Sequence, residues 1–134
     1  MLLEKIEKYY GKSYDLNCAE TILYAASEEY SLNLSKETFK TMAGFGGGMA
    51  VEKVCGALTG AIAVLGVMYT KERSHEDTKM KILTQEMYNR FVEKLGTENC
   101  GKLKLNYRTE ETRCSSMVNI AGGILEDIVN REEV

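Results

Sequence analysis

Cysteine is the residue type in this sequence with the greatest capacity for chemistry. The chain contains four of them, Cys18, Cys55, Cys100 and Cys114. The thiolate form of cysteine is both a nucleophile and a soft metal ligand. Four such residues suit thiols that cycle with disulfides, an iron–sulfur cluster, or a zinc ion. We therefore predict that they form one site, in which they act as redox thiols or as metal ligands.

The spacing of the cysteines differs from that of common metal motifs. The intervening segments contain 36, 44 and 13 residues, whereas zinc ribbons and ferredoxins use close Cys-x-x-Cys pairs. The lack of such a pair also disfavours a thioredoxin-like exchange enzyme. A site assembled from distant helices is compatible with this spacing, which leaves a disulfide, a cluster and zinc as alternatives.

Each cysteine is expected near the N-terminus of a helix. Asn17 and Asn99 are favourable N-cap residues, and they directly precede Cys18 and Cys100. Cys55 opens an apolar segment, and the fourth cysteine lies near the start of the last helical pattern. Helix N-termini carry unpaired N–H groups and partial positive charge, which stabilise thiolates and lower cysteine pKa values. A cluster held by four thiolates is a net anion, so this placement favours iron–sulfur over zinc.

Glycines surround the second cysteine. Gly46, Gly47 and Gly48 are consecutive, and their N–H groups are predicted to form a nest for a thiolate, a cluster sulfide or part of a substrate. Gly56 and Gly60 would let a neighbouring backbone approach the start of the next helix closely. The alternatives are structural, because such loops also serve as tight connections and buried cysteines also serve as core residues.

Helices must position these residues. Apolar side chains recur with helical spacing along the chain, and no useful length alternates with period two. The sequence predicts an all-α fold, a single-domain bundle of about five to seven helices over residues 1–134. Ser35 and the segment 74–77 are expected to start helices, and Gly96 is expected to end one. The apolar run 54–69 is expected to be a buried central helix.

Composition restricts the function classes. The chain has 134 residues, 44% of them hydrophobic, and a net charge of −3 without a basic stripe, which argues against nucleic acid as a partner. The run 54–69 is too short and too interrupted by glycine to span a membrane. The amphipathic N-terminus lacks the features of a signal peptide, so we expect a cytoplasmic protein, where structural disulfides are rare.

The cysteines occur in a defined order around a central motif: Cys18, then Cys55-Gly56-Ala57-Leu58-Thr59-Gly60, then Cys100, then Cys114. Together with the glycine-rich stretch 44–49, this order resembles a family of redox-active proteins named for its Cys, Gly-Cys-Ala-x-x-Gly, Cys, Cys pattern. The sequence departs from that pattern in one respect, because a glycine follows Cys55 instead of preceding it. The resemblance implies a helical domain with redox or metal chemistry at the four cysteines, and it implies no substrate.

Two functions follow as hypotheses. The first is a redox protein, an oxidoreductase or electron carrier with a partner protein, whose cofactor is an iron–sulfur cluster or, for a dithiol site, none. The second is a helical binding module stabilised by zinc. Such a module would dock a partner enzyme or form a homodimer, and small residues such as 121–123 would suit tight helix contacts in either case. A hydrolase or transferase is disfavoured, because His75 is the only histidine and there is no nucleophile motif.

Overall fold

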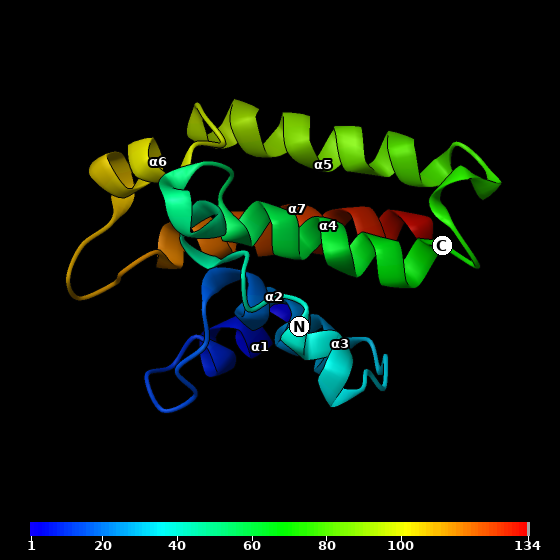
Figure 1. The fold of residues 1–134 in the computed structure, drawn as a ribbon, viewed down its shortest axis with the longest axis horizontal. Coiled ribbons are helices and arrows are strands. Elements are labelled where there is room, and N and C mark those ends of the chain that lie inside the picture. Colours follow the sequence, from blue (N-terminus) through cyan, green and yellow to red (C-terminus); the bar gives the residue numbers. More distant parts are fainter. Residues whose placement is uncertain (134) are drawn as a thin grey trace.

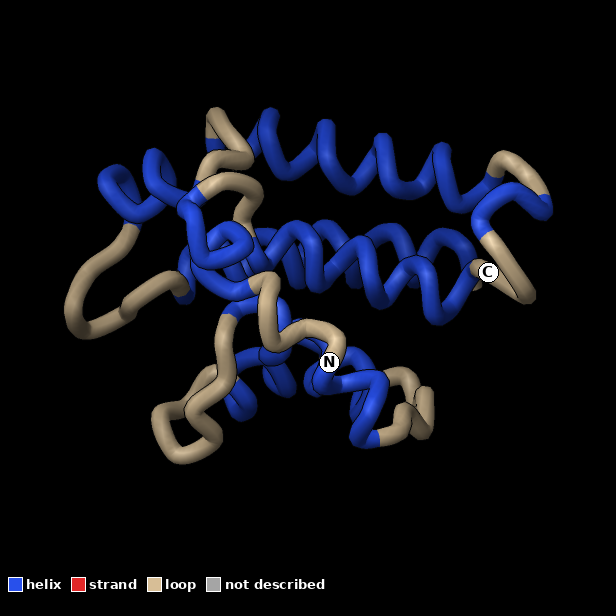
Figure 2. Tube along the Cα trace, viewed as in Figure 1, coloured by secondary structure: helices blue, strands red, loops and turns tan. Residues whose placement is uncertain are grey.

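The computed structural model describes residues 1–133, and this part of the chain is all-α, as the sequence predicts. Figures 1 and 2 show helices joined by loops, and no strand occurs among these residues. The number of α-helices, seven, agrees with the predicted range. They are α1 Leu2–Tyr9, α2 Cys18–Glu29, α3 Lys36–Lys40, α4 Gly56–Tyr69, α5 Lys79–Leu95, α6 Cys100–Tyr107 and α7 Ser115–Glu132.

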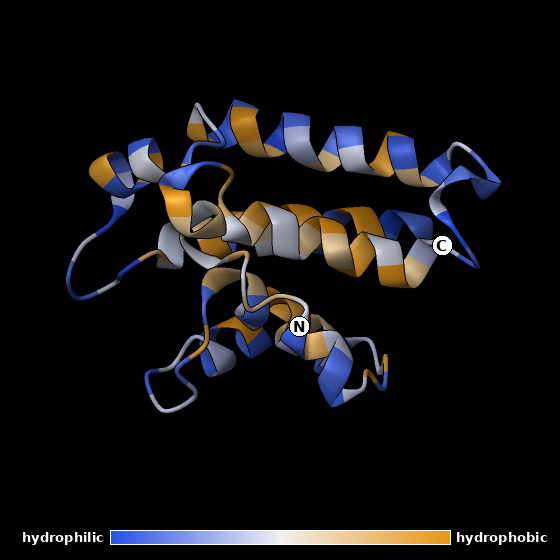
Figure 3. Cartoon of the chain, viewed as in Figure 1, coloured by the Kyte–Doolittle hydropathy of each residue, from blue (hydrophilic) through white to orange (hydrophobic). Residues whose placement is uncertain are grey.

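Helix α4 is the central element of the fold. It packs against α2, α5 and α7, and Figure 1 shows it running between α5 and the group formed by α1, α2 and α3. Its residues are apolar or weakly polar, whereas α5 alternates between hydrophilic and hydrophobic faces (Figure 3). The prediction of a buried central helix is confirmed.

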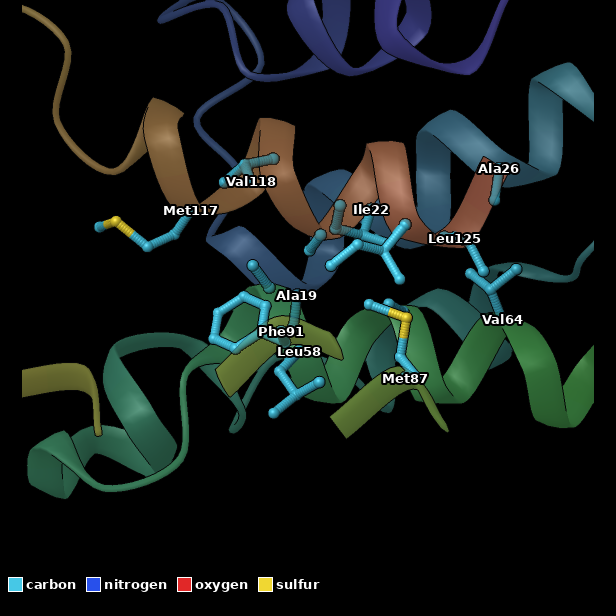
Figure 4. Packing of buried hydrophobic residues seen from close by; sticks show 14 of the residues in the cluster. Ala19, Ile22, Ala26, Leu58, Val64, Met87, Phe91, Met117, Val118 and Leu125 are labelled. Carbon is cyan, nitrogen blue, oxygen red and sulfur yellow. The ribbon is translucent and has the colours of Figure 1, made fainter. Parts of the chain in front are cut away.

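The core lies where α2, α4, α5 and α7 meet. Figure 4 shows Ile22 of α2, Leu58 of α4 and Phe91 of α5 converging there, and all three are fully buried. Burying a side chain of this size stabilises the fold by about 1.5–3 kcal/mol. None of the helices within residues 1–133 combines the length and apolar character that a bilayer crossing needs.

Two close helix contacts depend on glycine. A Cβ atom on Gly60 of α4 would lie 2.8 Å from the carbonyl oxygen of Ala19 in α2, so only glycine permits this approach. Gly122 of α7 likewise packs against the side chain of Ile6 in α1. Of the small residues at 121–123, Gly122 therefore serves a contact within the chain, whereas a Cβ added to Gly123 would meet nothing within 4 Å.

Several predicted helix ends are confirmed. Asn17 caps α2 through a reciprocal pair of hydrogen bonds with Glu20, and the side chains of Ser35 and Asn99 cap α3 and α6. Gly96 ends α5 with a φ of 90°. These caps matter for function, because two of them precede a cysteine.

The predicted start of α5 is wrong. Residues 74–77 do not open that helix; Ser74–Glu76 form a separate short turn, and α5 begins at Lys79. The reason is the Glu76 carboxylate, which accepts hydrogen bonds from the backbone N–H groups of Lys71, Glu72 and Arg73 and so closes a turn of its own.

Candidate functional site

All four cysteines lie at helix starts, as the sequence predicts. Cys18 and Cys100 are the first residues of α2 and α6, and Cys55 and Cys114 are the residues that immediately precede α4 and α7. The helix starts bring them together, because all four line one cavity of about 240 Å³. Figure 1 shows α6 and the beginnings of α4 and α7 at the same end of the molecule.

Backbone pairing joins the starts of α4 and α6. The Cys55 N–H donates to the carbonyl oxygen of Glu98 at 2.8 Å, and the Cys100 N–H donates to that of Lys53. These two hydrogen bonds flank an antiparallel bridge between residues 54 and 99. Two cysteines that are far apart in the chain therefore line the same wall.

The glycine-rich loop forms a left-handed turn. Residues 47–50 all have φ near +62°, including the non-glycine residues Met49 and Ala50. Left-handed conformation costs a non-glycine residue roughly 1–2 kcal/mol, so the surrounding structure must hold this turn. It packs against α6 and supports the Cys100 side of the cavity.

The glycines predicted to bind an anion or cofactor have two different roles in the structure. Gly47 and Gly56 line the cavity beside the cysteines. Gly46 and Gly48 serve close packing instead, because an added Cβ would lie 2.5 Å from the Asn17 side chain at the first and 2.7 Å from the Cys100 Cβ at the second. The loop therefore positions the thiols through close backbone contact.

Cys18 and Cys114 form a thiol pair. Their ionisations depend on each other, because the interaction between the two side chains lowers the pKa of Cys114 and raises that of Cys18. Burial opposes the ionisation of Cys114, but the positive charges of Arg108 and Lys104 favour it, and the pKa of Cys114 falls to about 6. Burial raises the pKa of Cys18 further. The pair therefore holds one thiolate, on Cys114, and one proton, on Cys18.

The other two cysteines differ from the prediction of lowered pKa values. Burial is the largest influence on both, and it raises the pKa of Cys100 and brings that of Cys55 to about 11. The N–H groups of Ala57 and Leu58 at the start of α4 do lower the pKa of Cys55, but they do not offset its burial. Only Cys114 has a lowered pKa, and the cause is its neighbours Cys18, Arg108 and Lys104, not the N–H groups of the helix start.

Two residues that sequence reasoning missed complete the site. The Tyr10 hydroxyl accepts a hydrogen bond from the Cys114 N–H at 3.0 Å, and the Tyr10 side chain favours a lower pKa at both Cys18 and Cys114. The Arg113 guanidinium lies 4.2 Å from the centre of the Tyr10 ring and donates to the Tyr10 carbonyl oxygen. No motif marks this contact, because it joins residues more than 100 positions apart.

The cavity has a positive wall. Lys104, Arg108 and Arg113 line it, and within residues 1–133 no Asp or Glu does. The whole chain carries a net charge of −3, so the excess of positive charge is confined to this wall. The cavity therefore favours negative charge, whether a thiolate of the protein or a bound anion.

A single metal ion does not fit this arrangement of side chains. In the part of the chain that the structure describes, no three His, Cys, Asp or Glu side chains come close enough together to hold one. The cysteines are instead spread around the cavity wall. An iron–sulfur cluster separates its ligands more widely than a single ion does, and four thiolates are its usual donor set. Four thiolates are a donor set for zinc as well as for a cluster, so the donor set by itself does not choose between the two predicted metal centres.

Fold and site define an all-α protein with a four-cysteine cavity, and comparison with known proteins assigns its family. The family model described as "Putative redox-active protein (C_GCAxxG_C_C)" matches residues 16–128, so the chain belongs to that family. An "Uncharacterized protein" of Archaeoglobus fulgidus is 29% identical over 120 residues, which covers 78% of this chain and 79% of the relative. No solved structure matches the chain significantly.

The thiolate assignment predicts selective alkylation. In reduced protein treated briefly with iodoacetamide, Cys114 is expected to react first, with a midpoint near pH 6. Below that pH its sulfur is protonated and the rate falls; an ordinary thiol has its midpoint near pH 8.5. Arg108→Gln should raise the midpoint, and Lys102→Gln, which removes a charge outside the cavity wall, should not. Equal reactivity of all four cysteines, measured by peptide mass spectrometry, would contradict the assignment.

The glycine contacts predict a difference between neighbouring variants. Gly47→Ala and Gly48→Ala both place alanine at a φ of +62°, but only the second adds a Cβ that meets Cys100 and Lys53. We expect Gly47→Ala to cost roughly 1–2 kcal/mol of stability and Gly48→Ala about 1–3 kcal/mol more. Urea unfolding measures both, and Gly48→Ala should also change the alkylation rate of Cys100. Equal stability of the two variants would show that residue 48 does not lie in tight contact with Cys100 and Lys53.

Proposed function

We propose that this protein is a thiol–disulfide redox protein in which Cys114 is the attacking thiolate and Cys18 is the second, resolving thiol. The observation that carries this proposal is the presence of Cys18 and Cys114 together in the wall of the positively charged cavity, where each thiol influences the ionisation of the other. Thiol exchange needs a thiolate to attack and a second thiol close enough to complete the exchange. The pair supplies both groups.

The reaction proceeds in two displacements. The Cys114 thiolate attacks one sulfur of a substrate disulfide, which forms a mixed disulfide and releases the other substrate sulfur as a thiolate. Cys18 passes its proton to that thiolate, and its own sulfur then attacks the Cys114 sulfur. This closes a Cys18–Cys114 disulfide and releases the second substrate sulfur, which takes a proton from water. The substrate gains two electrons, the protein loses two, and the reverse sequence restores the dithiol.

Residues next to the thiol pair position Cys114 and stabilise its thiolate. Tyr10 holds the backbone of Cys114 through its hydroxyl group, and Arg113 fixes the Tyr10 ring from above. Arg108 and Lys104 stabilise the attacking thiolate through their charge. Cys55 and Cys100, whose pKa values are raised, remain thiols during this exchange.

An iron–sulfur protein is the second candidate, and one observation favours it. All four cysteines line the same cavity together with three cations, and a cluster with four thiolate ligands is an anion. Cys18, Cys55, Cys100 and Cys114 would hold the cluster, which would supply one-electron transfer. In that case the protein carries electrons and does not exchange disulfides. Zinc in a binding module is less well supported, because a single ion does not fit.

Cysteine variants test the dithiol proposal. Cys18→Ser should accumulate a mixed disulfide on Cys114 when it meets a disulfide substrate, because the resolving thiol is missing. Cys114→Ser should form none, and Cys55→Ser, the matched control, should exchange at nearly the normal rate. Non-reducing mass spectrometry measures the adducts. Adducts distributed evenly over the remaining cysteines of Cys18→Ser would overturn the assignment.

Metal analysis tests the second candidate. Protein purified without oxygen should be colourless and contain iron and zinc far below one equivalent if the site is a dithiol. A cluster would give visible absorbance that is lost in Cys55→Ser as completely as in Cys114→Ser. Brown protein with this loss would replace the dithiol proposal with the cluster.

A further inference from the structure

The positive wall of the cavity contains a cation without a partner. Lys104 lies 3.5 Å from the Glu52 carboxylate, and Arg113 is engaged with the ring and carbonyl oxygen of Tyr10. The Arg108 side chain is exposed, and among residues 1–133 it makes neither a salt bridge nor a side-chain hydrogen bond. Arg108 is therefore the cation that remains available to a ligand.

Arg108 lies in the wall of the cavity that contains the reacting sulfur of Cys114. It follows the last residue of α6 and lines the same cavity as the cysteines. Its positive charge lowers the pKa of both Cys100 and Cys114. A guanidinium presents a planar set of donors that binds a carboxylate in two parallel hydrogen bonds. A substrate anion held there would lie next to the attacking thiolate.

Oxidation increases the need for an anion in the cavity. In the reduced protein the Cys114 thiolate offsets part of the charge of Lys104, Arg108 and Arg113. When the Cys114 sulfur becomes part of a disulfide, that negative charge is lost and the three cations remain. An anionic group on the substrate replaces the lost charge at the moment of exchange, because charges in a partly buried site are weakly screened.

The size of the cavity limits the substrate. At about 240 Å³ it is smaller than the about 300–1,000 Å³ typical of sites for drug-sized ligands. It can therefore hold the reacting disulfide and one adjacent charged group while the rest of the substrate stays outside, and a recess of this size favours a small-molecule disulfide over the broad surface of a folded partner.

We propose that the substrates of this site are small-molecule disulfides that carry carboxylates, and that Arg108 is the residue that selects them. This inference rests on the proposed thiol–disulfide function, and it assigns the class of substrate. The Arg108 guanidinium binds a carboxylate while the adjacent disulfide sulfur meets Cys114.

Two disulfides of opposite charge test this selection. Reduced protein is mixed with oxidised glutathione, which is anionic, or with cystamine, which is cationic, and the rate constant of mixed-disulfide formation is measured for each. The ratio of the two rates is normalised to the same ratio for dithiothreitol, which removes the intrinsic reactivity of each disulfide. The ratio also cancels any change in the Cys114 pKa, because both disulfides meet the same thiolate.

The wild-type protein is expected to prefer oxidised glutathione, and Arg108→Gln should reduce the normalised ratio about tenfold, as loss of a charge-assisted pair does. Lys102→Gln, which removes one positive charge from the same helix outside the cavity, should leave the ratio nearly unchanged. A ratio that is the same in the wild type and Arg108→Gln overturns the selection by Arg108 and leaves the thiol exchange intact. Protein that reacts with neither disulfide overturns the exchange function itself.

Discussion

Four helices begin at the wall of one cavity, and the partial positive charges of their N-termini repel one another there. Lys104, Arg108 and Arg113 add full charges to the same wall, which lacks a carboxylate throughout residues 1–133. A negative charge inside the cavity relieves this repulsion. The cysteine sulfurs are the groups in the wall best able to supply it, and Cys114 does so.

Burial explains why the cavity contains one protein thiolate and not four. Each sulfur that ionises loses the solvation of water, and a second thiolate would be repelled by the first. The pKa values of Cys18, Cys55 and Cys100 are therefore raised, while the interaction with Cys18 lowers that of Cys114. This division between one thiolate and neighbouring thiols is the condition that disulfide exchange requires. A cluster would use the same positive environment differently, because its ligands are all thiolates.

Close backbone contacts hold the cavity in shape. Gly60 allows α4 to touch α2 one residue beyond Cys18, and Gly48 brings the left-handed turn against Cys100. The hydrogen bonds of Cys55 and Cys100 to the opposite segments then join α4 to α6. These contacts leave little freedom for the backbone around the sulfurs, which keeps the thiol pair within reach of each other.

The sequence by itself determined the all-α class, most helix boundaries and the placement of every cysteine at a helix start, because these depend on local periodicity and on caps such as Asn17 and Asn99. It also indicated that the glycines near Cys55 matter. The cysteine pKa values could not be predicted from helix position, since burial and neighbouring charge outweigh the N-terminal N–H groups. Only the tertiary structure decided that Cys18 pairs with Cys114, that Tyr10 and Arg113 support them, and that Arg108 finds no partner among residues 1–133. Those relations join distant parts of the chain, and no local pattern encodes which helix ends meet.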